Sequence, residues 1–70
     1  MMPISFVNAG ETVTVRKITG SDSVRQHLAE LGFVVDTDIK VVTQLGGNII
    51  VQVKDSRIAL DKSMANRIMV

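Results

Sequence analysis

The 70-residue chain contains no cysteine, no tryptophan and no tyrosine, and it has only two phenylalanines and one proline. Without cysteine there is no disulfide, no thiolate nucleophile and no cysteine-ligated metal site. A chain that needs no disulfide suits a reducing compartment, and we expect a cytoplasmic protein. No stretch approaches the roughly 20 apolar residues of a membrane span, and the first residues lack a secretory signal pattern.

The charge and aromatic content disfavours two classes of ligand. Eight basic and seven acidic residues are spread along the chain and give a net charge of +1. Nucleic-acid-binding proteins usually cluster basic residues and stack bases on aromatic side chains. Grooves that bind polyproline helices are lined with aromatics, and Phe6 and Phe33 are the only ones here. We therefore expect no nucleic-acid partner. The alternative is a small RNA- or ribosome-associated protein, for which binding to nucleic acid should depend on salt concentration.

Alternating apolar and polar residues predict five short β-strands, at residues 12–16, 39–45, 49–53, 57–60 and 68–70. Gly46-Gly47-Asn48 separates the second and third strands and is typical of a hairpin turn. Asp55-Ser56 predicts a second tight turn, so that three consecutive strands form a meander. After residue 16 the alternation breaks, which indicates a bulge or the end of the first strand.

One helix is predicted over residues 23–31. Ser23 and Gln26 have the spacing of a capping box at its start. Its apolar face consists of Val24, Leu28 and Leu31. A second, very short helical turn is predicted at residues 62–65, capped by Asp61.

The end of the first helix is also encoded locally. Gly32 stands where a helix needs a residue in the left-handed conformation just past its end. Phe33 stands where a Schellman motif makes an apolar contact back onto Leu28. We therefore expect the helix to end at this point and the chain to turn back toward the sheet.

Together these elements predict a mainly β fold: one domain over residues 1–70, built as a small SH3-like barrel of about five antiparallel strands with one inserted helix and a short helical turn before the last strand. Closure of the barrel would remove the exposed sheet edges. The predicted core is Val13, Val15, Ile18, Leu28, Leu31, Phe33, Ile39, Val41, Ile49, Val51, Val53, Ile58, Leu60, Ala65, Ile68 and Val70.

Three segments of the sequence resemble the FeoA family of small proteins of bacterial ferrous iron transport. They are residues 28–33 (LAELGF), 58–60 (IAL) and 64–70 (MANRIMV), and the similarity extends from Gly10 to the end. The family commonly has Pro-Gly in the turn after the helix, whereas this chain has Val35-Asp36. Because Asp tolerates the left-handed conformation, we expect a changed turn here and not a lost one.

The resemblance implies an SH3-like barrel that accompanies FeoB, a large membrane GTPase permease for Fe(II), and acts on it from the cytoplasmic side without entering the membrane. The same type of domain forms the C-terminal part of some iron-dependent repressors. An alternative function is therefore a free-standing regulatory SH3-like module, which should come with a DNA-binding partner. Neither the regulatory effect nor the oligomeric state follows from the sequence.

Candidate functional residues gather around the predicted helix and its exit. The helix exit carries an apolar run that can be longer than the core is able to bury, so part of it can be exposed; it consists of Leu31, Phe33, Val34 and Val35. The polar residues Arg25, His27 and Glu30 are nearby. We expect this edge to contact the partner; the alternative is that these residues only pack the helix against the barrel.

No catalytic residue, cofactor or metal site is expected. His27 and Glu30 are one helical turn apart and have the chemistry of metal ligands. A closed metal site needs about four ligands, however, and no others stand at a recognised spacing. We therefore expect a binding protein and not an enzyme.

Overall fold

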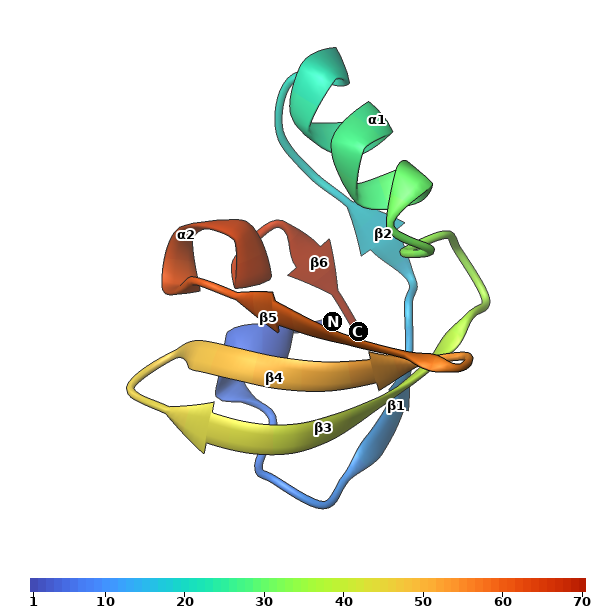
Figure 1. Ribbon diagram of the computed structural model, residues 1–70. Coiled ribbons are helices and arrows are strands. Elements are labelled where there is room, and N and C mark those ends of the chain that lie inside the picture. Colours follow the sequence, from blue (N-terminus) through green and yellow to red (C-terminus); the bar gives the residue numbers. More distant parts are fainter.

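The computed structural model describes residues 1–70 and contains two antiparallel sheets around one apolar core (Figure 1). The larger sheet has the spatial order β1 (Thr12–Thr14), β3 (Asp38–Leu45), β4 (Asn48–Val53) and β5 (Ser56–Leu60). The smaller sheet pairs β2 (Lys17–Ile18) with β6 (Ile68–Met69). The helical elements are the 3-10 turn η1 (Ile4–Phe6), the helix α1 (Asp22–Glu30) and the short helix α2 (Lys62–Ala65).

The two sheets are joined where the first predicted strand breaks. Val15 donates its backbone N–H to Thr37 at 2.9 Å, beside the larger sheet, and Arg16 donates its own to Met69 at 2.8 Å, in the smaller one. The chain therefore changes partner between these two residues. The predicted break in the first strand is present but comes earlier than expected, between Val15 and Arg16 and not after residue 16, and its physical basis is the passage from one sheet to the other.

The predicted meander is confirmed, with tight two-residue turns. Gly46 and Gly47 join β3 to β4 with φ values of 60° and 93°, as a type I′ hairpin turn requires. Lys54 and Asp55 join β4 to β5, and Lys54 has a φ of 54°. This second turn lies one residue earlier than Asp55-Ser56, where the sequence placed it.

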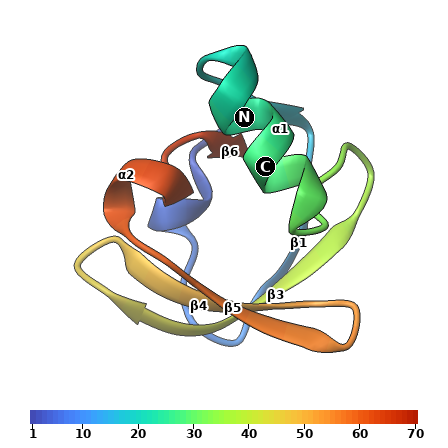
Figure 2. The same ribbon diagram turned by 45° about the horizontal axis from the view of Figure 1, so that its top comes forward.

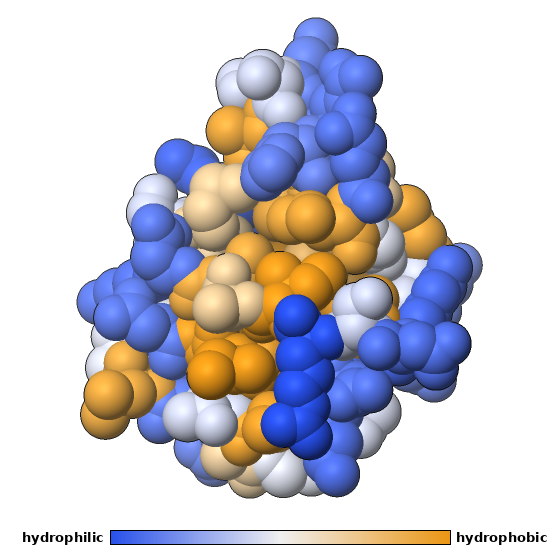
Figure 3. All heavy atoms as spheres, in the orientation of Figure 1, coloured by the Kyte–Doolittle hydropathy of each residue, from blue (hydrophilic) through white to orange (hydrophobic).

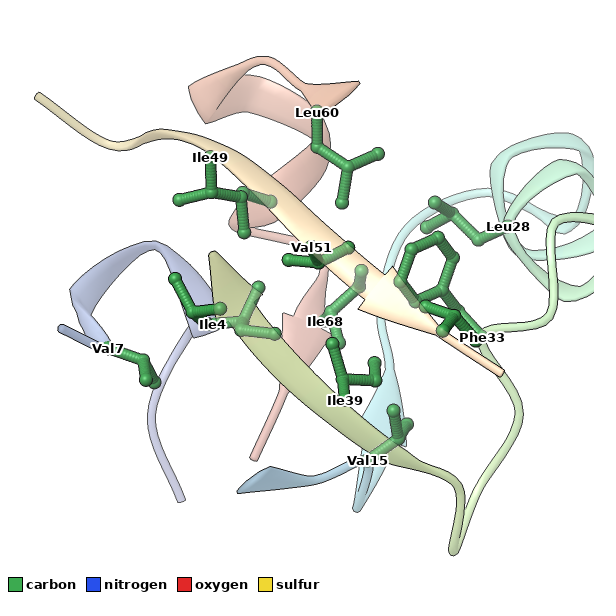
Figure 4. Close-up of a cluster of buried hydrophobic side chains, with 13 residues drawn as sticks. Ile4, Val7, Val15, Leu28, Phe33, Ile39, Ile49, Val51, Leu60 and Ile68 are labelled. Atoms are coloured by element: carbon green, nitrogen blue, oxygen red, sulfur yellow. The ribbon is translucent and has the colours of Figure 1, made fainter. Parts of the chain in front are cut away.

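The core agrees with the predicted set except at the N-terminus and the periphery (Figure 4). Ile4 and Val7 are fully buried. Their burial was not predicted, because the 3-10 turn that positions them is too short for a periodic pattern. Five predicted core residues are only half-buried and pack against the cluster: Val13, Ile18, Leu31, Ile58 and Val70.

The start of α1 differs from the prediction and its end agrees with it. Ser21, not Ser23, is the N-cap, and its hydroxyl accepts the Val24 N–H at 3.3 Å. Ser23 lies within the first turn, so the predicted capping box with Gln26 is wrong. At the other end Gly32 has a φ of 104°, as expected from the Schellman pattern.

The meander and the helix α1 lie on different sides of the molecule. Figure 2 shows β3, β4 and β5 on one side of the core with α1 across from them, whereas α2 follows β5 and contacts β4 and β5. The barrel is not closed on every side, because β5 is the last strand of its sheet and has a neighbour only in β4. No helix is long and apolar enough to cross a membrane.

Candidate partner-binding surfaces

The helix α1 divides the three polar residues that the sequence grouped together. His27 and Glu30 are three positions apart and therefore share one side of the helix. Arg25 is two positions from His27, which corresponds to a rotation of about 200° around the helix axis, so its side chain lies on the other side of the helix. There its guanidinium pairs with the Asp22 carboxylate, and both side chains are exposed. The structure therefore brings His27 and Glu30 together and leaves Arg25 apart.

Val34 and Val35 are exposed on a turn whose backbone is well anchored. The exposed fractions of the two residues are 44% and 54%. Thr37 donates its N–H to the Val34 carbonyl at 3.1 Å, and Asp36 donates to the Val15 carbonyl at 2.8 Å. Asp36 has a φ of 74°, so the expected left-handed turn is present. These bonds hold two apolar side chains in solvent on a fixed backbone.

Leu31 and Phe33 contribute less to the surface than the sequence suggested. Phe33 has no exposed area and belongs to the core, so it is not available to a partner. Leu31 is half-buried and packs against the same core. The candidate surface is therefore defined as His27, Glu30, Val34 and Val35 with the exposed part of Leu31, and is called the helix-exit surface below.

The side chains of the helix-exit surface are suited to contact with another protein. No group of three or more His, Cys, Asp or Glu side chains in the structure is arranged to hold a metal ion. Glu30 accepts a hydrogen bond from the Gln26 amide at 3.4 Å, whereas the His27 side chain has no hydrogen-bond partner. The surface thus combines apolar side chains with freely available polar ones, which is the composition of a protein contact.

A second apolar surface lies on the outer face of the meander and was not predicted. Leu45 and Ile50 are 76% and 39% exposed. They line an open groove of about 370 Å³ together with Thr43, Asn48, Ala59 and Asp61. Figure 3 shows apolar side chains gathered over this part of the molecule, with hydrophilic ones around them. The run Ile49-Ile50-Val51 was an available signal, because in a strand the middle residue must face away from its neighbours.

Comparison with known proteins identifies the family. The model of the FeoA domain matches residues 2–70. A protein of Methanocaldococcus jannaschii named "Putative Fe(2+) transport protein A" is 34% identical over 70 residues, which is all of this chain and 85% of that one.

Solved structures agree with this. The zinc complex of FeoA from Stenotrophomonas maltophilia, described as a prokaryotic SH3 domain protein, superimposes with a TM-score of 0.85 at 29% identity, over 99% of this chain and 88% of that one. A manganese-dependent transcriptional repressor has the same fold with a TM-score of 0.84 at 22% identity, over 97% of this chain and 41% of the repressor. The predicted SH3-like fold is therefore confirmed, and the chain belongs to the FeoA family of ferrous iron transport proteins.

Proposed function

We propose that this protein is a non-catalytic accessory of Fe(II) uptake that binds the cytoplasmic GTPase part of a FeoB-type membrane permease. The observation that carries the proposal is the match to the FeoA domain over residues 2–70, together with a relative named for Fe(2+) transport. In this proposal Fe(II) is the cargo of the permease, and the present chain acts through protein contact.

The arrangement of polar residues supports binding over catalysis. Covalent catalysis uses a nucleophile within hydrogen-bond reach of a base that a third group orients. His27 is the only histidine, and its side chain has no hydrogen-bond partner. The nearby Asp22 carboxylate pairs with Arg25 instead.

The helix-exit surface is the proposed contact with the permease. Val34 and Val35 stand on a turn that backbone hydrogen bonds already order, so a partner would not have to order it on binding. Preordered contact residues strengthen association because less conformational entropy is lost. His27 and Glu30 would then form the polar rim that surrounds an apolar contact.

The test is a binding titration between this protein and the purified GTPase domain of the permease. Replacing both Val34 and Val35 by Asp should weaken binding at least tenfold, whereas His27→Ala should weaken it less, as is usual for a rim residue. The control is Phe6→Asp, which introduces one negative charge where the double variant introduces two. It changes an apolar residue that is 65% exposed on η1, and it should leave binding unchanged.

Two outcomes would contradict the proposal. If the folded wild-type protein does not bind the GTPase domain, the partnership is wrong. If Phe6→Asp weakens binding as much as the Val34 and Val35 substitutions do, the contact is elsewhere on the molecule.

A second candidate function is a regulatory SH3-like module. The likeness to the manganese-dependent repressor, at 22% identity, concerns the fold alone. A gene for a DNA-binding protein beside this one would favour the regulatory function, and a permease gene would favour the transport function.

A further inference from the structure

The outer edge of β5 carries unpaired backbone groups. Because a two-residue turn joins β4 to β5, the residues of β5 that hydrogen-bond to β4 are Ser56, Ile58 and Leu60. The N–H and C=O groups of Arg57 and Ala59 therefore point away from β4. No backbone hydrogen bond elsewhere in the chain uses them, and both residues are exposed.

Arg57 and Ala59 are each the last member of a row of neighbouring side chains. Both rows run across β3, β4 and β5 on the outer face of the meander. The first row is Lys40, Gln52 and Arg57, and the second is Thr43, Ile50 and Ala59. One row is thus basic and the other largely apolar. The apolar row lies in the groove described above, and Figure 3 shows the contrast in hydropathy on this face.

We infer that the free edge of β5 binds an extended segment of a partner protein, in which an acidic side chain stands two positions from a large apolar one. A strand added to β5 would pair with the backbone of Arg57 and Ala59 at a spacing of about 4.8 Å. Residues directly opposite each other share a face of the sheet. The acidic residue would lie beside Arg57 and the apolar one beside Ala59.

The charges on this face favour an acidic partner. Arg57 donates through Nε to the Gln52 amide oxygen at 3.2 Å and contacts no carboxylate. Two carboxylates near this face are engaged within the chain. The Asp38 carboxylate accepts the Thr14 hydroxyl at 2.7 Å, and that of Asp61 accepts the Met64 N–H at 2.8 Å.

This distribution favours a different chain over a second copy of this one. A second copy would present the same engaged carboxylates and the same unpaired arginine. An extended segment of another protein can place a free carboxylate directly opposite Arg57, which is the stabilising cross-strand arrangement.

The shape of the face suits a large apolar residue beside Ala59. The methyl group of Ala59 is the smallest side chain of its row, and it leaves the groove of about 370 Å³ open on the side of Ile50 and Leu45. A leucine-sized side chain on an added strand would cover these groups. Nothing in the backbone of β5 blocks addition, because its register with β4 has no bulge and it contains no proline.

The inference goes beyond the proposed function and is independent of it, because the β5 edge shares no residue with the helix-exit surface and its test uses no permease. The probe is a capped heptapeptide, Ser-Thr-Glu-Val-Leu-Thr-Ser, titrated into the isotopically labelled full-length protein and followed by NMR. We expect the amide signals of Arg57 and Ala59 to shift most. The same peptide with lysine in place of glutamate should bind about fivefold more weakly.

Two variants test the geometry. Arg57→Glu should reverse the preference, so that the lysine peptide binds more tightly than the glutamate peptide. Ala59→Pro removes the outward N–H while sparing the bonds to β4, and it should abolish binding of both peptides. Ala59→Ser is the matched control and should keep the preference of the wild type.

Three results would overturn the inference. One is the absence of shifts at Arg57 and Ala59 at millimolar peptide. Another is equal binding of both peptides to the wild type and to Arg57→Glu. The third is a concentration dependence of the Arg57 and Ala59 signals without peptide, which would mean that two copies of the chain pair through β5. If Ala59→Pro does not fold, the comparison of the glutamate and lysine peptides on the wild type and on Arg57→Glu still decides the question.

Discussion

Phe33 donates its backbone N–H to the carbonyl oxygen of Leu28 at 3.0 Å, and the side chains of both residues are fully buried. Gly32 makes the companion bond to Ala29 at 3.0 Å. The end of α1 is therefore a complete Schellman motif, in which the backbone bonds and the apolar contact reverse the chain at one point. This reversal returns the chain to the core immediately before the exposed Val34-Val35 turn.

Gly32→Ala should lower the free energy of unfolding by about 2 kcal/mol, because a side chain is strained in the left-handed conformation. An added Cβ would also lie 3.1 Å from Cγ1 of Val53. The matched control is Gly10→Ala, where φ is 93° and no atom lies within 4 Å, so only the backbone strain applies. Urea denaturation of both variants is the measurement; an equal loss would mean that the Val53 contact does not matter.

The two phenylalanines should respond very differently to truncation. Phe33→Ala removes the largest fully buried side chain and should cost about 3–5 kcal/mol, which is as much as a single core usually supplies in a chain of this size, so we expect the variant to be unfolded. Phe6→Ala changes a residue that is 65% exposed and should alter stability by less than about 0.5 kcal/mol. One-dimensional NMR spectra distinguish folded from unfolded protein. A well-folded Phe33→Ala would contradict the packing described here.

Much of the fold could be predicted because its signals are local. The Gly46-Gly47 turn, the alternation in β3 and β4, and the Asp61 cap each lie within a few consecutive residues; Asp61 accepts the Met64 N–H at 2.8 Å as expected. The burial of Ile4 and Val7 could not be predicted in the same way. It depends on distant parts of the chain, since Gln44 donates its amide to the carbonyl oxygens of Ser5 and Val7.

The start of α1 can be tested by removing one hydroxyl at a time. Ser21→Ala should lower the free energy of unfolding by about 1 kcal/mol, because the Val24 N–H loses its partner. Ser23→Ala should change it by less than about 0.5 kcal/mol, because Ser23 is exposed within the helix. Thermal denaturation followed by circular dichroism gives both values. The reverse order would restore Ser23 as the cap.

Asp36 provides a test of the turn that presents Val34 and Val35. Its φ of 74° is tolerated by Asp and Gly but is strained for a β-branched residue. Asp36→Val should therefore lower the free energy of unfolding by about 1–2 kcal/mol. Asp36→Gly, the control, should leave it within about 0.5 kcal/mol, because relief of strain offsets the added freedom of the unfolded chain. Equal effects in chemical denaturation would show that the backbone conformation is not the cause.

The candidate surfaces were harder to predict than the fold, because exposure depends on three-dimensional neighbours. The apolar run at the helix exit was visible in the sequence, but only the structure separates the buried Phe33 from the exposed Val34 and Val35. Arg57 and Ala59 carried no signal of their own. Their interest comes from the free edge of β5 and from the rows of side chains behind them, which only the strand register reveals.

The pairing of Ile18 with Ile68 sets an order of events in folding. The two residues are about fifty positions apart, so bringing them together carries a larger loop-closure entropy than either two-residue hairpin does. Met2 and Val70, which exchange backbone hydrogen bonds at 3.0 and 2.8 Å, are farther apart still. We expect the meander from β3 to β5 to form first. The pairing of the N-terminal and C-terminal segments would then complete the barrel, so that the last few residues hold it together.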